Sequence, residues 1–242
     1  MASPLEQFTI KPIIEAPGGL DYTNSALWMT IAVATATIFL VGGMRKREMV
    51  PGPWQSMAES VYEFIGNMIR DNVGSEGRKF FPLIFTIFMF VLFGNALGML
   101  PGAFTYTSHI IVTFSLALFV FLFVTLVGIA KHGLHFFSFF APSGAPKALY
   151  PLIVPIEIIS YLSRPISLSV RLFANMVAGH TMLKVFAGFV FGLGAVTFGV
   201  GAIGPIVINV LLIGFEFMIA FIQAYVFTIL TCLYLNDALH LH

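Results

Sequence analysis

Charged and amide side chains stand inside two long apolar stretches near the C-terminal end of this sequence. The first stretch is residues 148–193 and contains Glu157, Arg164, Arg171, His180 and Lys184. The second stretch is residues 202–235 and contains Asn209, Glu216 and Gln223. An ionised side chain at the centre of a bilayer costs ~2.5 to 3.5 kcal/mol on insertion scales, so such residues usually face a partner or a water-filled cavity. Residues of these types therefore indicate a route for ions or protons, provided that helices bring them together.

The first stretch places its polar residues at a regular interval. Glu157, Arg164 and Arg171 are each separated by seven positions, and Asn175 follows Arg171 by four. A helix has ~3.6 residues per turn, so a step of seven drifts by only about 20° around the axis. The sequence therefore predicts one helix with a single polar face. The alternative is that ion pairs on this face merely hold helices together.

The second stretch repeats the pattern, because Asn209, Glu216 and Gln223 are also seven positions apart. If the two helices form an antiparallel hairpin through residues 194–201, Arg171 lies level with Gln223, and Glu216 lies near residues 178–180. Glu216 and His180 would then share one side of a hydrophilic path. On a helical wheel His180 is about half a turn away from Arg171, so the alternative is that it lines a neighbouring water cavity.

The whole chain has the composition of a membrane protein. It has 242 residues, of which 58% are hydrophobic and 10% charged, with a mean hydropathy of +0.95. Runs of roughly 20 apolar residues can cross the hydrocarbon layer as helices, and the runs here are continuous, unlike the short alternating segments of a barrel. We therefore expect an all-α integral membrane protein with one membrane domain, residues 1–242, and five transmembrane helices at 25–43, 80–100, 108–129, 148–193 and 202–235.

Two further segments lie outside these runs. Residues 53–73 place apolar side chains at helical spacing with charges elsewhere, which predicts an amphipathic helix on the membrane surface; the alternative is a soluble helix packed on another subunit. Residues 1–24 are mixed and polar and do not resemble a cleavable signal peptide. We expect them to form an outer segment, to which the sequence assigns no role.

The distribution of basic residues predicts the orientation. Residues 45–79 hold six lysines and arginines and residues 131–147 hold two, whereas the alternating connections contain only Lys11. Lysine and arginine near span ends are retained in the cytoplasm. The N-terminus is therefore expected outside and the C-terminus in the cytoplasm. A net charge of +1 gives no basic field for nucleic acid.

Three other features have ordinary explanations. Residues 199–204 match a dinucleotide-binding glycine pattern but follow an apolar helix rather than a strand, so we expect a turn between helices. His132, His135, His240 and His242 have no cysteine or carboxylate that completes a plausible ligand set, so we expect no metal. The single cysteine, Cys232, lies in an apolar run and is expected to be an inert buried thiol.

Residues 167–180, SLSVRLFANMVAGH, resemble the arginine-bearing signature of the F-type ATP synthase subunit a family. Residues 93–102, FGNALGMLPG, and residues 216–223 are also similar to that family, and the resemblance covers the chain from about Tyr22 onward. Ala174 departs from the glycine of many bacterial members, which concerns only local packing.

The resemblance implies a stator that holds two proton half-channels against a rotating ring of c subunits and so couples proton flow to ATP synthesis. Arg171 would match the family's arginine, Gln223 the polar residue facing it, Asn175 a neighbouring polar position, and Glu216 with His180 an acid and histidine pair. Residues that would support the polar path are Glu157, Arg164, Asn209 and Asn95.

The resemblance also implies the surroundings of the chain. Its partners would be the c ring, b-type peripheral stalk subunits, the rest of the synthase and the lipid bilayer, with no cofactor and no catalytic site in this chain. A bacterial inner membrane is expected, with the mitochondrial inner membrane as the alternative.

Two other classes of protein compete with this interpretation. A quinone-linked membrane enzyme would need more intramembrane lysine and glutamate, or haem-binding histidine pairs. A self-contained proton-coupled transporter would bind its substrate near a broken helix at a repeat interface, and the sequence shows no internal repeat.

Overall fold

A computed structural model of the protein describes residues 8–15, 21–45, 48–100, 102–140, 149–197 and 199–240, without the side chains of residues 134, 137 and 138. Two short strands, β1 (Pro12–Ile14) and β2 (Tyr22–Thr23), pair antiparallel before the first helix. The helices are α1 (Asn24–Met44), α2 (Pro53–Val73), α3 (Phe81–Gly98), α4 (Ile110–His132), α5 (Tyr150–Val196) and α6 (Ile203–Leu239). The short helical turns that connect them are η2 (Ser75–Phe80), η3 (Tyr106–Ser108), η4 (Gly133–Phe140) and η6 (Val200–Ala202).

Among the described residues, five helices are long and apolar enough to cross a membrane: Asn24–Met44, Ser75–Gly98, Ile110–His132, Tyr150–Val196 and Val200–Leu239. Their number and order agree with the sequence analysis, and the predicted class of an all-α membrane protein is confirmed. The observed helices extend past several of the apolar runs. Helix α6, for example, continues four residues beyond the predicted end at 235. The residues there are partly polar, but their backbone N–H groups still bond to carbonyl oxygens one turn earlier, so the helix outlasts the apolar run.

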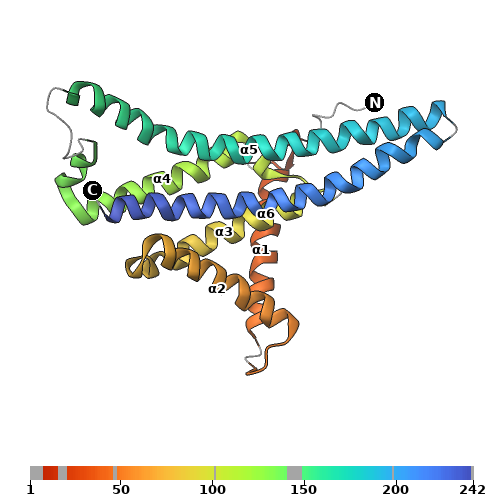
Figure 1. Ribbon diagram of the computed structural model, residues 1–242. Helices are drawn as coiled ribbons and strands as arrows, with labels where there is room; N and C mark the ends of the chain where they lie inside the picture. The colour runs from red at the N-terminus through yellow and green to blue at the C-terminus, as the bar shows by residue number, and fades with distance from the viewer. Residues whose placement is uncertain are drawn as a thin grey trace.

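Helices α5 and α6 form an antiparallel hairpin that runs across the whole molecule (Figure 1). They contain 47 and 37 residues, which at ~1.5 Å per residue is about 70 and 55 Å, against a hydrocarbon layer ~30 Å thick. Helices of this length must lie at a steep tilt to remain within a bilayer. The predicted long antiparallel pair of helices is thus confirmed, and Figure 1 shows α1 crossing it at a large angle.

Two prolines lie inside α5, Pro155 and Pro165. Each lacks a backbone N–H, so the carbonyl four residues earlier loses its helical partner, and the helix bends where this happens. The N-terminal half of α5 is bowed in Figure 1. Between the two prolines, the Tyr161 hydroxyl of α5 lies 2.7 Å from the Thr125 hydroxyl of α4.

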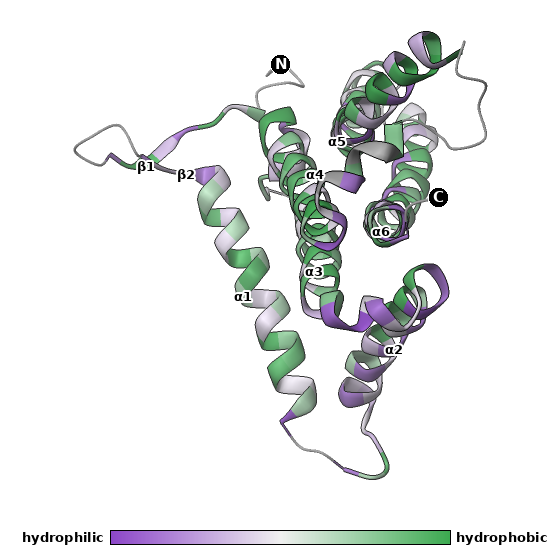
Figure 2. Ribbon diagram, turned by 90° about the vertical axis from the view of Figure 1, so that its left-hand side faces the viewer, coloured by the Kyte–Doolittle hydropathy of each residue, from purple (hydrophilic) through white to green (hydrophobic). Residues whose placement is uncertain are grey.

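Helix α2 packs against α1, α3 and α6 of the same chain. The indole of Trp54 donates to the carbonyl oxygen of Phe39 in α1 at 2.9 Å. The ring of Phe64 lies 6.0 Å from Phe88 of α3 and 5.9 Å from Tyr225 of α6. Figure 2 shows hydrophilic residues along the outer side of α2 and η2, whereas α3 and α4 are mostly hydrophobic. The amphipathic helix therefore covers the bundle with its apolar face.

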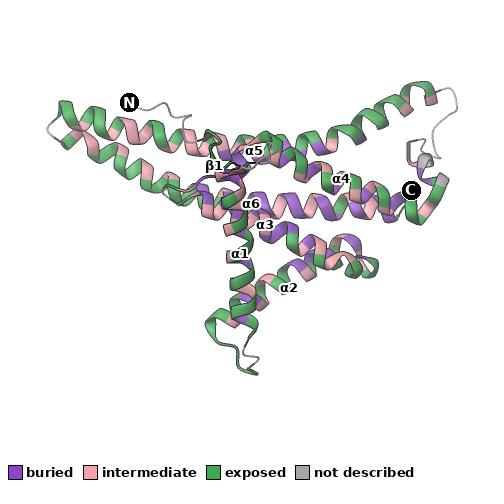
Figure 3. Ribbon diagram, turned by 180° about the vertical axis from the view of Figure 1, so that it is seen from behind, coloured by how far each residue is buried: buried purple, intermediate pink, exposed green. Residues whose placement is uncertain are grey.

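The buried core lies where α3, α4 and α6 meet, around residues such as Ile84, Val91, Val120 and Phe227. Buried residues are concentrated in this central region in Figure 3, and the far end of the α5–α6 hairpin is largely exposed. Exposed apolar side chains there include Phe191, Val196 and Leu211. Such surface is stable only in contact with lipid or another protein, which fits a membrane-embedded hairpin.

Candidate functional site

Arg171 stands near the middle of α5, on the side that the rest of the chain leaves open. Arg171 is exposed, whereas its neighbours Leu168 and Leu172 are buried against the core. Within the described parts of the chain, its guanidinium forms no hydrogen bond or ion pair. A permanently charged group on an apolar helix requires a counter-charge or water. Arg171 therefore needs a partner other than the described residues of this chain.

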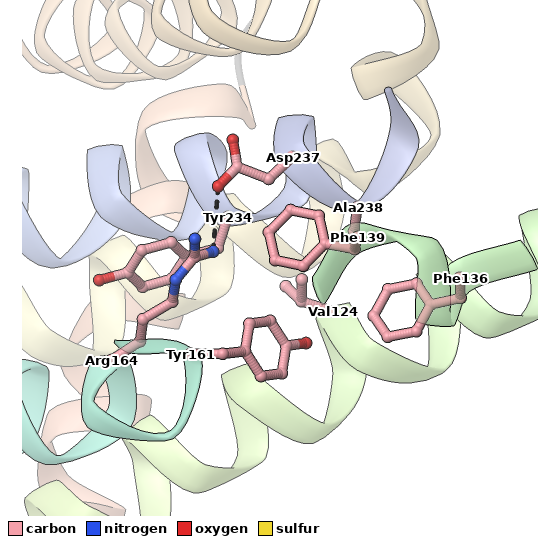
Figure 4. A pocket seen from close by; sticks show the side chains of 8 residues that line it. All are labelled: Val124, Phe136, Phe139, Tyr161, Arg164, Tyr234, Asp237 and Ala238. Atoms are coloured by element: carbon pink, nitrogen blue, oxygen red, sulfur yellow. Dashed lines mark hydrogen bonds and ion pairs between the residues drawn. The ribbon is translucent and has the colours of Figure 1, made fainter. Parts of the chain in front are cut away.

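Arg164 lies seven residues before Arg171 on the same polar face of α5, but it has a different environment. Its Nη1 donates to Asp237 Oδ2 of α6 at 3.0 Å. The guanidinium also lies 5.3 Å from the centre of the Tyr161 ring and 4.9 Å from that of Tyr234, distances at which a cation is attracted to an aromatic face. Figure 4 shows Arg164 between these two rings in a pocket closed by Phe139. Arg164 thus links α5 to the end of α6.

Asp237 is a polar residue that the sequence analysis missed. It lies 14 positions after Gln223, which is two further steps of seven along the polar face of α6. The intermediate position is the apolar Leu230. That spacing was a usable signal. The predicted apolar run ends at residue 235, whereas α6 continues to Leu239 and so includes Asp237.

Glu216 is buried in the hairpin, with only 5% of its surface exposed. A β-carbon placed on Gly179 of α5 would overlap the Glu216 carboxylate, so the carboxylate rests directly on the backbone of α5. This contact agrees with the predicted level of Glu216, near residues 178–180. Both carboxylate oxygens lack a hydrogen-bond partner among the described residues. A buried carboxylate without partners is costly, so water or a proton must reach it.

His180 follows Gly179 but projects toward a different element. Its Nε2 lies 2.9 Å from Thr105 Oγ1, in the connection between α3 and η3. The Phe8 ring of the N-terminal segment packs edge-on against the imidazole, with centroids 6.4 Å apart. Of the two alternatives for His180, a place beside Glu216 and a neighbouring cavity, the contacts place its ring against the α3–η3 connection. The carboxylate of Glu216 lies against the adjacent residue.

The other predicted polar residues lie along the same hairpin, except Asn95, which lies in α3. Gln223 is buried in α6, and Asn95 of α3 donates from Nδ2 to the carbonyl oxygen of Ala220 at 3.5 Å. Asn95 Oδ1 and Asn209 Oδ1 are buried without a partner among the described residues. Glu157 and Asn175 are half-buried. Unsatisfied buried polar atoms are rare in proteins and call for an ordered water or an ion as partner.

The contact between Gly179 and Glu216 sets the register of the two helices. Arg171 lies eight residues before Gly179, and Gln223 lies seven residues after Glu216. Because the helices are antiparallel, these steps run in the same direction, and at ~1.5 Å per residue they are about 12 and 10.5 Å. Arg171 and Gln223 therefore lie at nearly the same level of the hairpin.

Replacing Gly179 by alanine is expected to impair proton flux, because the new methyl group would displace the Glu216 carboxylate. Overpacking of this kind typically costs ~1–3 kcal/mol. Gly188→Ala is the matched control, since a β-carbon at Gly188 of the same helix meets open space. Proton pumping in vesicles, normalised to the amount of assembled complex, measures the effect. Equal pumping by the two variants would contradict the contact.

The structure also shows the surroundings of the glycine-rich segment, the single cysteine and the histidines near the end of the chain. Residues 199–204 form the connection from α5 through η6 into α6, with Gly199 at φ +93°, so the expected turn between helices is confirmed. Cys232 is buried in α6. His132 Nε2 is 3.2 Å from the carbonyl oxygen of Leu239, and His240 Nδ1 is 2.9 Å from Asn236 Oδ1. His242 and parts of the outer segment 1–24 lie outside the described residues.

The fold and the polar groups together define a multi-pass membrane protein whose last two helices carry buried polar side chains. A family model described as ATP synthase A chain matches residues 26–236. The ATP synthase subunit a of Parvibaculum lavamentivorans is 58% identical over an alignment 244 positions long, which covers 98% of this chain and 93% of that protein. Those of Paramagnetospirillum magneticum and Rhodospirillum rubrum are 54% and 55% identical, with 100% of both chains covered.

The chain belongs to the ATP synthase A chain family. Members of this family are components of the membrane sector of ATP synthase, and proton conduction linked to ATP synthesis is the family's function. The resemblance on residues 167–180 is thus confirmed over nearly the whole length, and a self-contained transporter is not favoured.

Proposed function

We propose that this chain is the stationary half of a proton path whose moving half is a ring of c subunits, each with a carboxyl group at mid-membrane. The observation that carries the proposal is Arg171, a charged residue exposed on an apolar helix without a counter-ion among the described residues. Its counter-charge is a ring carboxylate on another chain. No carboxylate in the described ranges forms an ion pair with Arg171.

One half-channel lies on the outer side of Arg171 and the other on its cytoplasmic side. On the outer side, a proton reaches the ring by way of His180 and Glu216 and neutralises a carboxylate, which can then rotate into lipid. On the cytoplasmic side, the proton leaves past the region of Glu157 and Arg164. The deprotonated carboxylate must pass Arg171, with Gln223 and Asn175 beside it. Asn95 and Asn209 hold water along the outer path.

Reconstitution tests the proposal against a transporter that works alone. Vesicles that contain only this chain are expected to show no uptake of protons driven by a potential, because half of the path is missing. Adding the c ring and the b-type stalk subunits is expected to restore conduction. Sustained proton uptake by the purified chain alone, in a preparation that mass spectrometry shows to be free of the ring, would refute the proposed role as a stator.

We further propose that the N-terminus lies outside and the C-terminus in the cytoplasm of a bacterial inner membrane, since the basic residues gather between residues 45 and 79. In a Cys232→Ser background, Ser60→Cys and Asp71→Cys on the exposed side of α2 should react only with a thiol reagent on the cytoplasmic side. Glu15→Cys should react from the outside. The reverse pattern would overturn the orientation. A mitochondrial inner membrane would place the same segment in the matrix.

A further inference from the structure

The hydroxyl group of Thr105 is held between two partners of different kinds. It donates to the carbonyl oxygen of Gly98 at 3.0 Å, and it lies 2.9 Å from His180 Nε2. Gly98 is the last residue of α3, where backbone carbonyls have no partner within the helix. The absence of a side chain at Gly98 lets Thr105 approach this closely, because a β-carbon there would overlap the threonine side chain.

The direction of the first bond decides that of the second. A carbonyl oxygen can only accept, and a hydroxyl group has one proton, so the proton of Thr105 is used on Gly98. The Thr105 oxygen must then accept from His180, which requires that Nε2 carry a proton. In a neutral imidazole only one nitrogen is protonated. His180 Nδ1 is therefore left with the free lone pair.

We propose that Thr105 is a positioning residue that fixes His180 as the Nε2–H tautomer, so that protons enter and leave the imidazole at Nδ1 alone. This inference rests on the proposed function and adds the atom through which His180 works. When a proton arrives, an N–H bond forms at Nδ1 and an imidazolium results. When the proton leaves, the same bond breaks. The bond from Nε2 to Thr105 persists throughout.

The surroundings of the imidazole fit exchange at Nδ1. This nitrogen is bonded to the ring carbon nearest the α5 backbone, and the Glu216 carboxylate rests against that backbone at the preceding residue, Gly179. Neither oxygen of Glu216 has a partner among the described residues, and no described residue bonds to His180 Nδ1. Water between the two groups would connect them. His180 thus serves as a proton store beside Glu216 rather than as a relay through both nitrogens.

The N-terminal segment covers another side of the same ring. Phe8 presents its ring edge-on to His180, and its carbonyl oxygen accepts from His109 Nε2 at 2.8 Å. Asn24 Nδ2 donates to the carbonyl oxygen of Thr9 at 3.1 Å and so holds the next residue. A phenyl ring offers the imidazole no strong acceptor. It therefore leaves Thr105 as the group that selects the tautomer.

The direct test is nitrogen-15 NMR of the assembled complex, with labelled histidine in this chain only and at a pH where imidazoles are neutral. The His180 signal is identified as the one lost in His180→Gln. We expect the spectrum of an Nε2–H tautomer in the unaltered protein. An Nδ1–H tautomer would overturn the proposal without any substitution at Thr105.

Variants at Thr105 then measure its contribution. Thr105→Val keeps the shape but removes the acceptor, and the tautomer ratio should fall by roughly two- to tenfold, the loss of one ordinary hydrogen bond; proton flux should fall with it. Thr105→Ser should restore both. Thr107→Val is the matched control, because Thr107 is also buried nearby and its hydroxyl has no partner among the described residues.

The outcomes separate this inference from the proposed function. If Thr105→Val leaves the tautomer ratio of His180 unchanged, or if Thr107→Val changes it equally, Thr105 does not position the ring. If His180→Leu slows proton flux while the tautomer proves to be Nδ1–H, the path stands and only the role of Thr105 falls. Unchanged pumping after joint replacement of His180 and Glu216 would instead refute the outer path itself.

Discussion

Arg171→Ala is expected to abolish ATP synthesis while the complex still assembles. In a confined, hydrated groove of effective dielectric ~20, two opposite unit charges ~4 Å apart attract by about 4 kcal/mol. That attraction is large enough to favour deprotonation of an arriving ring carboxylate, and small enough to be reversed when the ring turns. Alanine removes it. It also removes the barrier between the half-channels, so passive proton leak through the complex should rise.

Arg171→Lys should lose ATP synthesis as well, although it keeps a positive charge. A lysine side chain lacks the planar fork of the guanidinium and can lose its proton when it is desolvated. The passive leak of this variant should lie between those of the unaltered protein and of Arg171→Ala. ATP synthesis and proton leak are measured on the same vesicles, with the amount of assembled complex determined by immunoblot.

Lys184→Ala is the matched control, since Lys184 is a second exposed cation on α5 and lies near the end of a span, where its long side chain can reach the membrane surface. It should retain most of the synthesis activity. If Arg171→Ala still synthesises ATP at nearly the normal rate, the stator role is wrong. If Arg171→Ala is not inserted into the membrane, the arginine serves packing instead.

Replacing Glu216 and His180 together by leucine is expected to slow proton flux strongly without preventing assembly. Positioned proton-transfer groups typically contribute 10²- to 10⁴-fold to the rate of a reaction. Because water can carry part of the flux, we expect a decrease of at least about tenfold. Each single replacement should have a smaller effect than the pair. The assay is ATP-driven acidification of inverted vesicles.

The matched control is Phe217→Leu, which changes the neighbouring residue on the exposed side of α6 and should pump normally. Leucine at Glu216 also removes a buried carboxylate that has no partner in the described part of the chain, so assembly should be at least as efficient as in the unaltered protein. Pumping at the normal rate by the double variant would show that neither residue lies on the outer half-channel.

Much of the architecture could be predicted from the sequence. The continuous apolar runs can be satisfied only by helices in lipid, because unpaired backbone groups are too costly there. The heptad spacing of Arg164 and Arg171, and of Glu216 and Gln223, follows directly from the geometry of a helix. Both the class of fold and the two polar faces could therefore be predicted from the sequence, and the family signature at residues 167–180 indicated the candidate arginine.

The contacts of these residues could not be derived in the same way. Arg164 pairs with Asp237, 73 residues away in sequence, and His180 with Thr105, 75 residues away. A helical period gives the direction of a side chain around its own axis, and it says nothing about which residue of another segment lies opposite. Arg171 and Arg164 look equivalent in the sequence, yet only Arg164 has a counter-ion among the described residues.

The sequence by itself thus determined which residues are polar within the membrane, on which helical faces they lie and to which family the pattern is similar. The tertiary structure alone decided that Gly179 admits the Glu216 carboxylate, that Asp237 neutralises Arg164, and that Thr105 meets His180. The physical reason is that burial and hydrogen bonding depend on the packing of segments far apart in the chain, whereas hydrophobic runs and helical periodicity are local.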